Sequence, residues 1–232
     1  MWRSLTKHLR DLLRGDPEPI ARSLDEPGLR YPLVCCTTIV VGCSLYGATV
    51  GLWRAPVQAA YTAIKFPVLI FLTCAGNALL NGMLAQVLGS RLSFRQTSLA
   101  ILMSFAVAAV ILGALSPITL FVVQNTPPLA SSSASTGHSV TMVTHVLLIA
   151  YAGVVANQRL LGVLEKMSGD RATARTVLLS WLAGNFLLGS QVAYTIRPFI
   201  GNPAMPVQFL RDDPLRGNFY ETLGRAFAQL FG

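Results

Sequence analysis

The chain has 232 residues, of which 53% are hydrophobic and 12% are charged, and its net charge is +8. Soluble domains carry charge on about a quarter of their residues, so this composition excludes an ordinary water-soluble globule. No Asp, Glu, Lys or Arg lies between Gln96 and Gln158, whereas a helix crosses a bilayer with about 20 apolar residues. The sequence therefore predicts an all-α fold, a polytopic transmembrane helical bundle of about five spans with amphipathic N- and C-terminal helices.

Residues 1–30 are predicted to form a cytoplasmic amphipathic segment followed by a linker. The segment carries large apolar side chains at helical spacing with bases on the other faces, namely Trp2, Leu5, Leu9, Leu12 and Leu13. An apolar stripe rimmed by bases is typical of a helix that lies in the membrane interface. Packing on a partner protein or on the cytoplasmic loops is the alternative. Three prolines between Gly15 and Gly28 predict that the linker is extended.

Five uncharged blocks within residues 31–196 form the predicted transmembrane domain. They cover residues 31–53, 66–90, 97–124, 139–164 and 176–196. Each block can cross a bilayer as a helix, which satisfies its backbone polar groups internally. Pro67 is expected in the first turn of the second helix, where a missing amide hydrogen is tolerated. Residues 125–138 carry turn formers and hydroxyls, and we expect them in water or among headgroups.

The distribution of Lys and Arg predicts the orientation of the chain. With five spans and the N-terminus inside, twelve of the eighteen Lys and Arg residues lie on the inner face and six on the outer face. Basic residues accumulate on the cytoplasmic side of membrane proteins. We therefore expect the N-terminus in the cytoplasm and the C-terminus outside. A four-span arrangement, which brings the C-terminus inside, is the alternative.

Residues 197–232 combine a Pro-rich segment with a predicted amphipathic helix, in which Asn218 and Glu221 resemble a capping box. The segment carries more large apolar side chains than a free linker, so we expect it to fold back over the mouth of the bundle. A mobile tail is the alternative. The side chains predicted to dock on a partner come from both ends of the chain: Trp2, Leu5, Leu9, Phe199, Phe209, Phe219, Leu223 and Phe227.

The spans carry residues suited to helix packing. Small residues recur at every fourth position, which lets helix backbones approach closely; they are Cys43, Gly47, Gly51, Ala78, Gly82, Ala152 and Ala156. Amides and one imidazole also lie at membrane depth: Asn77, Asn81, His145, Asn185 and Gln191. Because polar groups that face lipid are costly, we expect them to form hydrogen bonds in the interior. A polar permeation path past Asn77 and Asn81 is the alternative.

The sequence contains no motif of an enzyme, a metal site or a cofactor site. It lacks a P-loop and the patterns HExxH, GxSxG and CxxC. Three histidines, with no acidic residue inside a span, leave too few ligands for a zinc or haem site. Membrane orientation explains the basic charge, so nucleic-acid binding is not expected. We expect a protein without catalytic residues, metal or cofactor.

Two loops resemble those of bacterial Yip1-domain membrane proteins. Residues 88–97, LGSRLSFRQT, are similar to the connection between the second and third spans of that family. In that family, a glycine, a basic residue and a Ser-Phe pair precede a helix that ends near a proline. Pro117 is the corresponding proline in this chain. Residues 164–175, LEKMSGDRATAR, resemble the second cytoplasmic loop of the family. The resemblance covers roughly residues 60–196 and does not include the acidic-aromatic motif of eukaryotic members.

This resemblance implies five helices, a cytoplasmic N-terminus, a place in the bacterial inner membrane and no enzymatic activity. Members of the family act by binding other membrane proteins. We therefore expect a non-catalytic integral membrane protein, embedded in the lipid bilayer, that serves as a partner-binding or scaffold subunit in a homo- or hetero-oligomer. The competing expectation is a small transporter or channel component that uses Asn77 and Asn81.

Overall fold

The structure is a computed structural model that describes residues 2–87 and 92–221, with side chains from residue 6 onward except at 85 and 86. Its elements are α1 (Trp2–Arg14), α2 (Pro17–Asp25), α3 (Arg30–Leu52), α4 (Pro56–Val87), α5 (Phe94–Gln124), α6 (Ala134–Ser168) and α7 (Arg171–Ile196). No strand occurs among the described residues. Five helices, α3 to α7, are long and apolar enough to cross a membrane. The predicted all-α transmembrane bundle is therefore confirmed.

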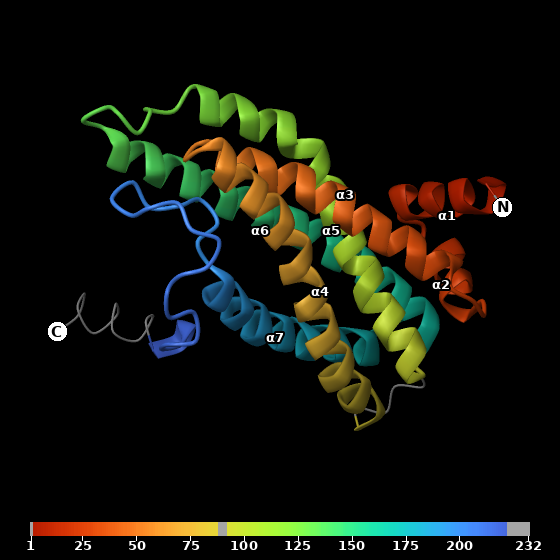
Figure 1. Ribbon diagram of the computed structural model, residues 1–232. Helices are drawn as coiled ribbons and strands as arrows, with labels where there is room; N and C mark the ends of the chain where they lie inside the picture. Colours follow the sequence, from red (N-terminus) through yellow and green to blue (C-terminus); the bar gives the residue numbers. More distant parts are fainter. Residues whose placement is uncertain (1, 88–91, 222–232) are drawn as a thin grey trace.

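The five long helices run to and fro between two ends of the bundle. Figure 1 shows α1 and α2 at one end and residues 197–221 at the opposite end. This arrangement follows from an odd number of long helices, because each one carries the chain to the other end. The described parts of the two chain ends thus lie on opposite sides of the apolar region.

The most buried helix is α3, which makes its main contacts with α4 and α5. Half of its most apolar stretch is buried, compared with 22% for α6 and 17% for α7. The core along α3 consists of side chains that are nearly inaccessible, namely Cys35, Ile39, Cys43, Tyr46 and Val50. Helices α6 and α7 lie at the flank, where they contact α5, α4 and each other. Most of their apolar surface consequently faces away from the chain.

The second span differs from its predicted bounds. Helix α4 begins at Pro56 rather than at residue 66. Pro67 consequently lies inside the helix, so the prediction that it occupies the first turn is wrong. The physical reason is that Pro56 is itself suited to the first turn, and residues 57–65 contain neither Gly nor Pro to end the helix. Lys65 therefore belongs to a helix and not to a loop.

The linker predicted to be extended contains a helix, α2, so that prediction is also wrong. Pro17 and Pro19 lie in its first turn, where the backbone amides need no partner within the helix. Ile20 and Leu24 are fully buried, and burial of each such side chain contributes about 1.5–3 kcal/mol. The burial of these two side chains explains why a Pro-rich segment folds as a helix.

A capping box begins α5. The Ser93 hydroxyl accepts a hydrogen bond from the Gln96 amide, and the Gln96 side chain accepts one from the Ser93 amide. The pattern Ser-x-x-Gln is visible in the sequence, within residues 88–97. The cap fixes the start of α5 three residues before the predicted span at 97–124.

Candidate functional site

The predicted small-residue face of α3 lies against the backbone of α4. A Cβ on Gly47 would lie 2.6 Å from the Thr62 carbonyl oxygen, and one on Gly51 would lie 2.5 Å from that of Gln58. Both distances are too short for a side chain, so the two helices require glycine at these positions. Cys43, on the same helix, is buried.

A glycine outside the predicted packing set makes a further close contact of α3. A Cβ on Gly42 would clash with the backbone of Ala109 on α5. The remaining packing candidates have other neighbours. Gly82 lies against the Phe94 ring, Ala78 is half-buried, and Ala152 and Ala156 are 1% and 2% exposed.

The amide pair of α4 is fully buried. Asn77 donates a hydrogen bond of 3.0 Å from Nδ2 to the Thr73 carbonyl, and Asn81 donates one of 3.4 Å to Asn77 Oδ1. Helix α7 covers both amides, since a Cβ on Gly184 would lie 3.0 Å from Asn77 Oδ1 and 3.4 Å from Asn81 Oδ1. Both asparagines are 0% exposed. The pair thus meets the backbone of a neighbouring helix.

The other predicted polar residues do not join this pair. His145 of α6 lies in the interior, where its Nδ1 and the Tyr46 hydroxyl of α3 form a hydrogen bond of 2.9 Å. Gln191 of α7 accepts a hydrogen bond of 3.0 Å from the Phe219 amide. Asn185 Oδ1 is buried and has no partner among the described residues. His145 and Gln191 therefore connect different parts of the chain.

The predicted docking residues have mixed surroundings. The ring of Phe199 packs against Phe66 of α4, and the ring of Phe209 packs against Tyr61. Phe209 and Leu9 keep about 40% of their surface exposed, at 41% and 40%. The side chains of Trp2 and Leu5, and all of Leu223 and Phe227, lie outside the described residues.

Lys65 is a buried cation that sequence analysis missed. It lies about 14 Å along α4 from Pro56, at 1.5 Å per residue, and is 1% exposed. Its Nζ donates a hydrogen bond of 2.8 Å to the Pro198 carbonyl and lies 5.0 Å from the centroid of the Phe209 ring. No carboxylate within the described residues forms an ion pair with it. Carbonyl and ring faces therefore replace water around this charge.

Two further polar side chains share the Lys65 face of α4. Gln58 Nε2 donates to the Phe199 carbonyl at 2.9 Å, and the Thr62 hydroxyl donates to the same oxygen at 2.6 Å. The positions 58, 62 and 65 recur at helical spacing. This spacing is visible in the sequence, although residues 54–65 lie outside the predicted spans.

Residues 198–209, named here the C-terminal cover, are held over the mouth of the bundle by this face. Arg54, in the turn between α3 and α4, adds a hydrogen bond of 3.0 Å to the Met205 carbonyl. Figure 1 shows the segment returning across the ends of the helices. The described part of the C-terminal segment thus packs on its own bundle.

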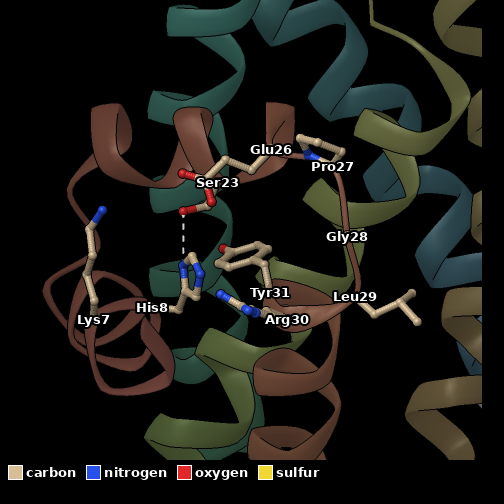
Figure 2. Close-up of a pocket in the computed structure, with 9 residues that line it drawn as sticks. All are labelled: Lys7, His8, Ser23, Glu26, Pro27, Gly28, Leu29, Arg30 and Tyr31. Carbon is tan, nitrogen blue, oxygen red and sulfur yellow. Dashed lines mark hydrogen bonds between the residues drawn. The ribbon is translucent and has the colours of Figure 1, made fainter. Parts of the chain in front are cut away.

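At the opposite end, α1, α2 and the start of α3 enclose a pocket of about 360 Å³, named here the N-terminal pocket. Its lining residues are Lys7, His8, Ser23, Glu26, Pro27, Gly28, Leu29, Arg30 and Tyr31. Figure 2 shows the hydrogen bond between Ser23 Oγ and His8 Nδ1, which is 3.3 Å long. Ser23 donates its one hydroxyl proton to the Pro19 carbonyl at 3.0 Å. His8 is therefore the donor to Ser23, and the pair is not arranged as nucleophile and base.

The described residues contain no group of three or more His, Cys, Asp and Glu side chains that could hold a metal ion. Comparison with protein families, with characterised proteins and with solved structures gave no match.

Proposed function

We propose that this integral membrane protein is a non-catalytic, partner-binding or scaffold subunit of a membrane complex. The observation that carries the proposal is the complete burial of Asn77 and Asn81 beneath α7. A permeation path needs polar groups that meet solute or water. Asn77 and Asn81 are the amides predicted to line such a path. They instead form hydrogen bonds within α4 and lie against α7.

The lateral surfaces of α6 and α7 support a role in partner binding. Their exposed side chains are large and apolar, including Val143, Val146, Leu147, Val154, Leu179, Phe186 and Leu187. Gly153 of α6 lies among them, and apart from its chain neighbours and the nearby backbone of its own helix no atom lies within 4 Å of its Cβ position. Small residues on an exposed helix face allow a second transmembrane helix to approach closely.

Orientation and membrane are part of the same proposal. The excess of Lys and Arg at the α1 end supports a cytoplasmic N-terminus. The resemblance of residues 88–97 and 164–175 to bacterial Yip1-domain proteins supports a place in the bacterial inner membrane. That resemblance also supports binding to other membrane proteins and the absence of catalysis.

A transport role is the second candidate, because one observation favours it. Three buried oxygen atoms, Thr73 Oγ1, Asn81 Oδ1 and Asn185 Oδ1, have no hydrogen-bond partner in the described part of the chain. Unpaired polar atoms at membrane depth are costly and often mark functional sites. Water or a small solute could satisfy them in the membrane.

The test compares the wild type with Gly153→Leu. After mild extraction and chemical crosslinking, the wild type should be recovered in a discrete oligomer or hetero-complex. Gly153→Leu should lose that species, while its thermal unfolding in detergent stays unchanged because the added side chain meets no neighbour. Recovery as a monomer, together with solute flux in liposomes, would contradict the scaffold role and favour transport.

A further inference from the structure

We propose that the N-terminal pocket binds the phosphate of one anionic phospholipid. The pocket lies between α1 and α2 and reaches Arg30 and Tyr31, the first two residues of α3. Because α3 is the first candidate span, its first turn lies where a crossing helix leaves the hydrocarbon. The pocket is therefore at the depth of lipid headgroups.

The charges of the pocket suit a single phosphodiester. Lys7 and Arg30 contribute two positive charges and Glu26 one negative charge, which leaves a net charge of +1 with His8 neutral. Neither cation forms an ion pair within the described residues. Charged hydrogen bonds from Lys and Arg to phosphate are among the strongest in proteins. A headgroup with one negative charge would complete the balance.

A neutral donor also faces this space. Tyr31 is 4% exposed, and its hydroxyl has no oxygen or nitrogen partner among the described residues. Figure 2 shows this hydroxyl pointing toward the Ser23–His8 pair, inside the pocket. The Cys35 thiol beside this hydroxyl is only a weak hydrogen-bond acceptor. A phosphate oxygen would supply a stronger one.

The wall of the pocket is fixed by a residue outside it. Arg95, in the first turn of α5, donates hydrogen bonds to the carbonyls of Leu24 at 3.0 Å, Glu26 at 2.7 Å and Gly28 at 3.3 Å. Gly28 adopts φ +123°, a conformation that favours glycine. The turn that carries Glu26 is thus held before any ligand binds, which lowers the entropic cost of binding.

The apolar surroundings favour a lipid over free phosphate. Leu29, on the rim of the pocket, is 74% exposed, and Leu33, one turn further into α3, is 58% exposed. On α1, Leu9 and Leu13 are also exposed. Acyl chains attached to the phosphate would cover these side chains along the outside of α3. Free phosphate would leave them uncovered.

The experiment is a lipid titration of the purified full chain in detergent, with bound lipid counted by native mass spectrometry. The probes are short-chain phosphatidylglycerol, phosphatidylcholine of the same chain length, and inorganic phosphate. We expect one phosphatidylglycerol to bind more tightly than phosphatidylcholine, and excess inorganic phosphate to compete weakly. The double variant Lys7→Gln/Arg30→Gln should bind phosphatidylglycerol about 25-fold more weakly, at about fivefold for each base.

Two variants complete the design. Glu26→Gln removes the negative charge of the pocket and should tighten phosphatidylglycerol binding. The control Arg14→Gln/Arg175→Gln removes two positive charges, as Lys7→Gln/Arg30→Gln does, but from exposed positions outside the pocket. It should bind phosphatidylglycerol like the wild type. Equal binding of both lipids, or equal weakening by both double variants, would overturn the proposal. Competition by inorganic phosphate at the affinity of the lipid would overturn the lipid assignment.

Discussion

The Lys65 ammonium donates a hydrogen bond of 2.8 Å to the carbonyl oxygen of Pro198, 133 residues further along the chain. The contact joins the interior face of α4 to the C-terminal cover. It places a cation inside an apolar helix, next to the rings of Phe199 and Phe209. A charge in this position is costly unless it has a polar partner. The position of the C-terminal cover therefore depends on its hydrogen bond to Lys65 of α4.

Replacing Lys65 by Met should release the C-terminal cover without unfolding the bundle. Methionine keeps most of the side-chain volume but removes the donor, and a hydrogen bond from a charged group contributes about 1.5–3 kcal/mol. In a background without the four native cysteines, Val207→Cys should then react with a maleimide about tenfold faster or more. Lys166→Met, at an exposed position, is the control. An unchanged labelling rate for Lys65→Met would show that the hydrogen bond does not hold the cover.

The number of spans could be predicted from the sequence, but their ends could not. Uncharged blocks report the part of each helix that lies in hydrocarbon, whereas a helix continues into the headgroups until a cap or a turn ends it. Lys65 illustrates the error. Because it bounds an uncharged block, it falls outside the predicted spans, although it lies inside α4 and is buried.

Spacing predicted which residues pack, but not what they pack against. The period of Gly47 and Gly51 marks a small face on α3, and only the structure assigns that face to α4 and the Gly42 face to α5. Similarly, prolines predicted an extended linker where α2 forms. Burial of Ile20 and Leu24 depends on residues distant in the chain, which local composition does not reveal.

Substituting leucine for Gly47 or Gly51 should destabilise the bundle. The side chain would have to displace the α4 backbone, and overpacking of this kind costs about 1–3 kcal/mol. Thermal unfolding in detergent should show a lower midpoint for each variant. Gly153→Leu is the matched control, because its Cβ position is open. Equal midpoints for all three variants would contradict the close contact between α3 and α4.

The proposed orientation predicts which loops an impermeant thiol reagent reaches. In the cysteine-free background, Leu215→Cys, at a position that is 82% exposed, should be labelled in intact cells. Ala172→Cys, in the first turn of α7 at the other end of the bundle, should be labelled only after lysis. The reverse pattern would place the N-terminus outside. Labelling of both sites in intact cells would show that the reagent had crossed the membrane.

Replacing both Asn77 and Asn81 by Leu distinguishes the two candidate functions. Leucine has the same number and branching of side-chain heavy atoms as asparagine but is larger, so the contact with Gly184 should persist while the polar contacts of the pair are lost. If the amides only stabilise the bundle, the free energy of unfolding should fall by about 1–2 kcal/mol, and liposomes containing the variant or the wild type should show no solute or ion flux. Asn157→Leu, at a half-buried position on α6 whose amide bonds to the Gly153 carbonyl at 2.7 Å, controls for loss of an amide elsewhere. Flux in the wild type that the double variant abolishes and Asn157→Leu preserves would contradict the scaffold proposal, because it would require solute to reach two side chains that are fully buried in this conformation.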